Sequence, residues 1–255
     1  METADHITAI AREAELLAAA ADRNGLDADI VWCPGWDMRD LVRHLGEIHL
    51  WAAGIVAQRT TKLWPDDISE HTVSWPDLAV FWPDDDKLTA WYLETNANLV
   101  RSLESAAINL DCPTFLPAPS PRAMWARRQA HETAVHRFDA ESAGGKLSKF
   151  DPVFAADGVD EILAAFAPRG REFPIESPKT MVVHATDTDD HWYVTMTPDG
   201  IDTVREEIPG DVSLAGTASD LYLALWNRQD DLGITVTGDR DVFDVWHKNH
   251  RLRWS

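Results

Sequence analysis

The spacing of the apolar residues changes near residue 150, and this change limits the possible folds more than any other feature of the sequence. Before this point, apolar residues recur every three or four positions, which is the period of an amphipathic α-helix. Beyond it, short runs rich in β-branched and aromatic residues lie between turn residues, which is typical of β-strands. The sequence therefore predicts a helical domain over residues 1–148 and an α+β domain over residues 149–255.

Four segments of the first half carry the helical period. The expected helices cover residues 5–22, 37–55, 85–107 and 122–143. Two segments that contain prolines, residues 60–84 and 108–121, interrupt the pattern and are expected to be loops long enough to cover a site. Four helices joined in this way predict a four-helix bundle.

The second half combines strand patterns with helical ones. Its expected strands cover residues 181–186, 192–196, 201–206, 211–215 and 233–237. Helical runs are expected at residues 221–226 and 241–249. This combination predicts a small α+β domain.

The charge of the chain argues against several kinds of partner. The sequence has 23 Lys and Arg against 43 Asp and Glu, a formal net charge of -20, which repels phosphate and anionic lipid. No stretch approaches the roughly 20 apolar residues of a membrane span, and the first residues lack the pattern of a signal peptide. Two cysteines are too few for a disulfide framework. We therefore expect a cytoplasmic protein that binds neither nucleic acid nor membrane.

Ionisable residues on the expected helix over residues 122–143 indicate a metal site. His131 and His136 are five residues apart, so they face directions about 140° apart and cannot bind one ion together. Glu132 and His136 are four residues apart and lie on one side of the helix, as a carboxylate and an imidazole that share an ion must. His49 and His131 fall off the ligand face and are expected at the surface or at an interface. Asp139, three residues after His136, is expected either to orient that ligand or to be a solvated acid.

A third ligand is expected from the helix over residues 37–55, where His44 lies in the apolar stripe with Leu41 and Leu45. An imidazole buried without a partner costs about 1–3 kcal/mol, and a cation bound between His44 and Glu132 would remove that cost. Two histidines and one glutamate leave the fourth position of Zn²⁺ open, which is the pattern of a catalytic site. A direct hydrogen bond between His44 and Glu132, with no metal, satisfies the same residues, so both interpretations stay open.

Two sequence segments resemble the mycothiol-dependent maleylpyruvate isomerase family. They are CPGWDMRDLVRHL at residues 33–45 and RQAHETAVHR at residues 128–137, with a looser likeness over residues 218–228. The resemblance implies a DinB-like four-helix bundle that binds a metal, followed by an α+β domain similar to sterol carrier proteins. It also implies that zinc is held by a histidine of the second helix and an E-x-x-x-H pair of the fourth, which match His44, Glu132 and His136.

The resemblance further implies a chemistry. A bound Zn²⁺, or another divalent metal, would deprotonate the sulfur of mycothiol, and the thiolate would attack a small electrophilic, acidic substrate in an isomerase or S-transferase reaction. The family uses an arginine of its second domain on the acidic substrate, and Arg228 is the nearest match. The residues by themselves leave two alternatives open: a metal-dependent hydrolase that activates water, and a non-catalytic ligand-binding module.

Overall fold

The chain divides into two compact units, Met1–Ser148 and Lys149–Ser255. The computed structural model describes residues 1–58, 63, 82–169, 175–229 and 233–249. Within these ranges, no helix combines the length and the hydropathy that a membrane span requires. Most of the loop predicted over residues 60–84 lies outside the described residues, so its predicted role as a cover stays a prediction.

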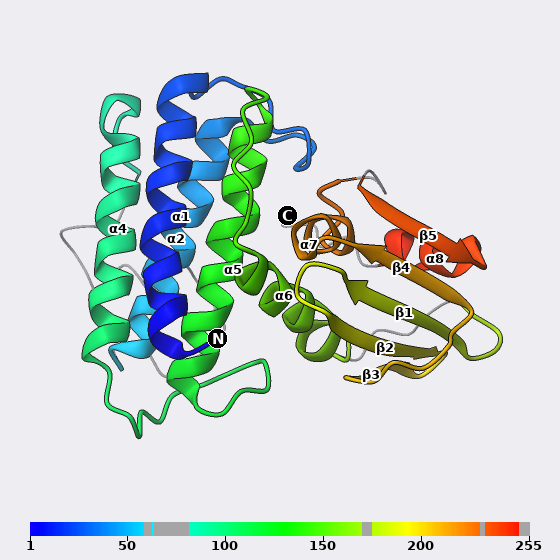
Figure 1. The fold of residues 1–255 in the computed structure, drawn as a ribbon. Helices are drawn as coiled ribbons and strands as arrows, with labels where there is room; N and C mark the ends of the chain where they lie inside the picture. Colours follow the sequence, from blue (N-terminus) through cyan, green and yellow to red (C-terminus); the bar gives the residue numbers. More distant parts are fainter. Residues whose placement is uncertain (59–62, 64–81, 170–174, 230–232, 250–255) are drawn as a thin grey trace. The chain divides into compact units, whose positions relative to one another are not determined.

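The first unit is a bundle of four long helices (Figure 1). Their bounds are Thr3–Asn24 for α1, Met38–Val56 for α2, Asp85–Ser105 for α4 and Pro121–Ser142 for α5. Helix α1 packs against α5 and α4, and α2 packs against α4 and α5. All four predicted helices are present, and the predicted helical bundle is confirmed.

Local sequence fixes where the two helices of the predicted site begin. The side chain of Asp37 accepts a hydrogen bond from the backbone N–H of Asp40, while the Asp40 carboxylate accepts one from Asp37, which forms a capping box at the start of α2. Helix α5 begins with Pro121 directly after the N-cap Ser120, where a missing N–H costs nothing. These caps set the position of each ligand candidate along its helix.

The core of the bundle is made of side chains from all four long helices. Fully buried members include Leu17, Leu41, Leu45, Leu88 and Tyr92. Helix α2 has a glycine, Gly46, where it meets the Trp91 ring of α4, and a Cβ at this position would collide with that ring. The glycine therefore leaves room for the partly buried indole between the two helices.

Charged side chains are also buried along α5, and they are paired. Arg137 is fully buried; its Nε donates to Glu13 of α1 at 2.8 Å, and its Nη1 donates to Glu141 at 2.7 Å. The same Nη1 donates to the carbonyl oxygen of Ser148 at 2.6 Å. Because a buried charge is tolerated only when it is paired, this network ties α1, α5 and the end of the unit together.

The second unit contains a five-stranded sheet in the order β3-β2-β1-β4-β5 (Figure 1). The strands are Lys179–Ala185 (β1), Asp190–Thr197 (β2), Gly200–Val204 (β3), Val212–Gly216 (β4) and Ile234–Gly238 (β5). Strands β1 and β4 are parallel, and all other neighbours are antiparallel. All five predicted strands are present, and the predicted α+β class is confirmed.

The helices of this unit include one that the sequence pattern did not predict. The predicted helices are present as Ala218–Leu225 (α7) and Arg240–Asn249 (α8). The additional elements are Pro152–Asp160 (α6) and the π-helical turn Glu161–Phe166 (η1) that continues it. The signal for α6 was Asp151, whose side chain accepts from two backbone N–H groups at the helix start, followed by Pro152 at the first helical position.

Candidate metal centre in the helical unit

The bundle brings the three predicted ligands together. His44 comes from α2, and Glu132 and His136 come from α5; one ligand atom of each lies within 4.8 Å of the others. His44 Nε2 lies 3.5 Å from Glu132 Oε1, and His136 Nε2 lies 3.4 Å from the same oxygen. Two imidazole nitrogens therefore flank one carboxylate oxygen.

These distances fit a shared cation. In a tetrahedral zinc site with ligands at about 2.0–2.1 Å, two ligand atoms lie about 3.3–3.4 Å apart. Glu132 Oε1 is buried and makes no hydrogen bond to any described residue, although a buried carboxylate oxygen normally has a partner. The contact of 3.5 Å to His44 is long for a hydrogen bond. The group therefore has the donor atoms and the spacing that a shared divalent ion requires.

The other oxygen of Glu132 is held by an arginine. Arg128, one turn earlier on α5, donates from Nη2 to Glu132 Oε2 at 2.9 Å, and both side chains are buried. Burial would raise the pKa of Glu132, but His136, His44 and Arg128 together hold it well below its ordinary value. These neighbours favour the ionised carboxylate, and Arg128 holds Oε2 so that Oε1 lies beside the two imidazoles.

His136 is oriented from its other nitrogen. Its Nδ1 lies 2.8 Å from Asp139 Oδ2, and Cys33 Sγ lies 3.5 Å from the same oxygen. Burial would lower the pKa of His136, but Asp139, Cys33 and Glu132 hold it well above its ordinary value. A carboxylate that accepts from Nδ1 leaves Nε2 as the nitrogen available to a metal, an arrangement common behind metal-binding histidines.

An indole packs beside the two imidazoles. The ring centroid of Trp36 lies 5.0 Å from that of His44 and 6.4 Å from that of His136. The two imidazole centroids are 5.2 Å apart. Trp36 belongs to the turn that precedes the cap of α2, so the segment before α2 supplies both an aromatic wall and, through Cys33, a contact to Asp139.

Two histidines were predicted at the surface or at an interface, and the surface alternative is wrong for both. His49 and His131 are both fully buried. His49 Nε2 lies 3.1 Å from Thr133 Oγ1, its ring stacks on Tyr92, and burial lowers its pKa to about 3. The error has a simple cause, because α5 and the neighbouring part of α2 are enclosed well beyond the ligand face, and a residue that leaves that face is still buried.

Sequence reasoning missed Arg128 and left Asp139 undecided between a solvated acid and a partner of His136. Arg128 stands four residues before Glu132, the spacing at which opposite charges pair on a helix, so a signal was present. Asp139 is fully buried and contacts His136, which removes the solvated alternative.

The fourth predicted site residue, Arg228, belongs to the second unit. It follows α7 and is 4% exposed, and its Nη1 donates to the carbonyl oxygen of Trp226 at 3.2 Å. Its backbone N–H donates to Leu223 at 2.9 Å. The first of these contacts fixes one end of the guanidinium, and its contact with a substrate remains a prediction.

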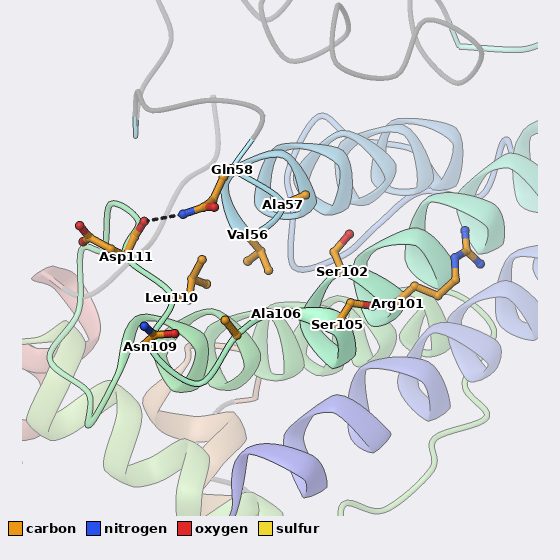
Figure 2. A pocket seen from close by; sticks show the side chains of 11 residues that line it. Val56, Ala57, Gln58, Arg101, Ser102, Ser105, Ala106, Asn109, Leu110 and Asp111 are labelled. Atoms are coloured by element: carbon orange, nitrogen blue, oxygen red, sulfur yellow. Dashed lines mark hydrogen bonds between the residues drawn. The ribbon is translucent and has the colours of Figure 1, made fainter.

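A groove of about 580 Å³ lies at the end of the bundle where α2 and α4 end (Figure 2). Gln58 points towards Asp111 and donates to its carbonyl oxygen at 3.2 Å. The lining residues include neither histidine nor cysteine and none of the three candidate ligands. This groove is therefore separate from the candidate metal ligands.

The chain combines two features: a helical bundle in which two histidines and a glutamate lie close together, and a small α+β unit that follows it. This combination describes a two-domain protein with a candidate metal site in its bundle. Residues 7–141 match the sequence model of the mycothiol maleylpyruvate isomerase N-terminal domain, and residues 154–244 match that of the C-terminal domain of the same family. The chain therefore belongs to the mycothiol-dependent maleylpyruvate isomerase family, a family of enzymes.

Solved structures show the same fold. The crystal structure of the mycothiol-dependent maleylpyruvate isomerase matches with a TM-score of 0.63 and 13% identity, covering 100% of this chain and 98% of that one. A histidine-to-alanine mutant of the mycothiol-dependent maleylpyruvate isomerase matches with a TM-score of 0.65, 13% identity and the same coverage. A search of curated protein sequences finds no significant match.

Proposed function

We propose that this protein is a zinc-dependent and mycothiol-dependent isomerase or S-transferase. His44, Glu132 and His136 would hold the ion. Membership of the family supports the dependence on mycothiol. The observation that most supports a bound metal ion concerns the buried Glu132 Oε1. This oxygen lacks a hydrogen bond among the described residues and has imidazole nitrogens at 3.4 and 3.5 Å.

Each surrounding residue has a distinct role in this proposal. A bound Zn²⁺ with three protein ligands keeps a fourth position open and lowers the pKa of a coordinated thiol, so that a thiolate is available near neutral pH. Arg128 keeps Glu132 ionised and oriented, and Asp139 fixes the ring of His136 with Nε2 towards the site. The Trp36 ring excludes water from one side of the imidazoles.

The substrate would be a small electrophile with an acidic group. The mycothiol thiolate would add to one carbon of an activated C=C bond, and the π electrons of that bond would move onto the conjugated acceptor group. In an isomerase, rotation about the resulting C–C single bond would be followed by expulsion of the thiolate and return of the double bond. In an S-transferase, protonation of the neighbouring carbon, or departure of a leaving group from the attacked carbon, would leave the sulfur attached. In a chain with a net charge of -20, an anionic substrate needs a local cation, and Arg228 is the proposed one. The metal and thiol chemistry thus falls to residues 1–148, and recognition of the acidic group falls to residues 149–255.

The hydrolase alternative requires a general base beside the metal. Glu132 is poorly suited to that role, because Arg128 holds one of its oxygens and two imidazoles flank the other. Asp139 is also poorly suited to act as the base, because it is buried and accepts from His136. Turnover of an ester or amide in the absence of any thiol would replace the proposed function with this alternative.

The proposal also places the protein in the cytoplasm, where low-molecular-weight thiols stay reduced.

A cobalt-substituted form tests the proposal directly. Mycothiol added to the Co²⁺ protein is expected to produce a charge-transfer band from sulfur to metal in the absorption spectrum. The His44→Ala variant is expected to lose the band, whereas Glu47→Ala, which changes an acidic residue on the same helix outside the cluster, should keep it. Absence of the band in the parent protein at saturating thiol would contradict the proposed activation of sulfur.

A further inference from the structure

The hairpin between β1 and β2 of the second unit carries a second group of metal-binding side chains. His184 of β1 and His191 of β2 are directly opposite each other in the antiparallel register. Their imidazole rings stack with centroids 4.0 Å apart and an angle of 11° between the ring planes. Asp189, in the turn, completes the group.

The three side chains have the donor atoms and the spacing of a metal site. Asp189 Oδ1 lies 3.4 Å from His184 Nε2 and 3.6 Å from His191 Nε2, and one ligand atom of each residue lies within 4.8 Å of the others. A charge-assisted hydrogen bond between nitrogen and oxygen is shorter, at about 2.7–2.9 Å. Ligands of one tetrahedral zinc ion lie at about 3.3–3.4 Å. The distances are closer to those of a shared ion than to those of two hydrogen bonds.

The turn directs Asp189 to this position. Asp189 adopts the left-handed conformation, with φ at +58°, and its N–H donates to the carbonyl oxygen of Ala185 at 2.8 Å. The two neighbouring acids have other partners: Asp187 accepts from the backbone N–H of Ala218 at 2.7 Å, and Asp190 pairs with Arg205. Of these carboxylates, the one that faces both imidazoles is therefore that of Asp189.

Solvent reaches the group. The side chains of His184, His191 and Asp189 are 32%, 20% and 91% exposed, so an ion can enter from solution and keep water in its remaining positions. The net charge of -20 raises the local concentration of cations. Imidazole and carboxylate donors suit Zn²⁺, Cu²⁺ and Ni²⁺ better than Mg²⁺ or Ca²⁺.

We propose that His184, Asp189 and His191 form a second binding site for a divalent transition-metal ion, of which Zn²⁺ is the probe. The site lies in the other unit from the candidate centre of His44, Glu132 and His136, and its ligands come from one hairpin. A bound ion would link β1 to β2 at their turn. Because it binds the folded hairpin, it would stabilise the second unit by mass action.

Calorimetric titration of the metal-free, full-length protein with Zn²⁺ tests this proposal. The parent is expected to bind two ions per chain, and both His184→Ala and Asp189→Asn are expected to bind one. Asparagine tolerates the left-handed conformation, so Asp189→Asn preserves the turn. Asp190→Asn is the matched control, because it removes the same charge from the adjacent position and should still bind two ions.

Separate outcomes distinguish this site from the one in the bundle. The His44→Ala variant is expected to keep one ion, and that ion is expected to be lost when His184→Ala is added. A second ion that persists in both His184→Ala and Asp189→Asn would overturn the proposal. So would a parent that binds one ion and loses it in His44→Ala, which would leave the bundle site intact. A single ion lost in His184→Ala but kept in His44→Ala would support the hairpin site and refute the bundle site.

Discussion

Replacing Asp139 with asparagine removes one charge behind the candidate metal centre and leaves the size of the side chain almost unchanged. Asp139 is fully buried, and its Oδ2 lies 2.8 Å from His136 Nδ1. An asparagine amide can donate to Nδ1, which moves the ring proton to Nε2, the nitrogen that would bind the ion. Loss of such a partner lowers metal affinity about 10–100-fold, or about 1.4–2.8 kcal/mol.

Competition with a chromophoric zinc chelator measures this loss for Asp139→Asn against the parent. Asp86→Asn, which changes an exposed acid in the first turn of α4, controls for the change in net charge. Urea unfolding of the metal-free forms shows whether the variant still folds. Zinc affinities that agree within twofold between Asp139→Asn and the parent would refute the argument that Asp139 sets the ring proton of His136.

Two further predictions concern stability. Arg137→Met should lower the free energy of unfolding by about 3–5 kcal/mol in urea titrations, because it leaves Glu141 buried without its cation and leaves Glu13 with only the half-exposed Arg12; a loss below about 1 kcal/mol would contradict this. The unfolded state protonates His49 near pH 6.5, whereas the folded state does so only near pH 3, so the contribution of His49 is complete above pH 6.5 and falls as the pH drops towards 3. His49→Gln should therefore remove about 1.4 kcal/mol per pH unit from the slope of stability between pH 6 and 4, and equal slopes would contradict it.

The candidate centre was predictable because its ligands follow helix geometry. Glu132 and His136 share a face through their spacing of four residues, and His44 lies in an apolar stripe whose start is fixed by the Asp37 cap. Such regularities depend on local sequence alone. The meeting of α2 and α5 at the same depth followed from the bundle and from the resemblance to a family.

Features that depend on how two segments pair or pack were not predictable. The hairpin group needs His184 opposite His191, and periodicity cannot supply a strand register. The burial of His49 depends on the ring of Tyr92 from α4, and the network of Arg137 depends on Glu13 from α1. In each case the missing information was which element packs against which.

Metal content, measured by elemental analysis of purified parent and Glu132→Ala protein, tests the centre in the bundle most directly. Zinc bound at the hairpin would obscure the comparison, so both proteins carry Asp189→Asn. The account predicts about one zinc per chain with Glu132 present and almost none without it. Equal zinc in the two proteins would remove Glu132 from the ligand set and contradict the central claim.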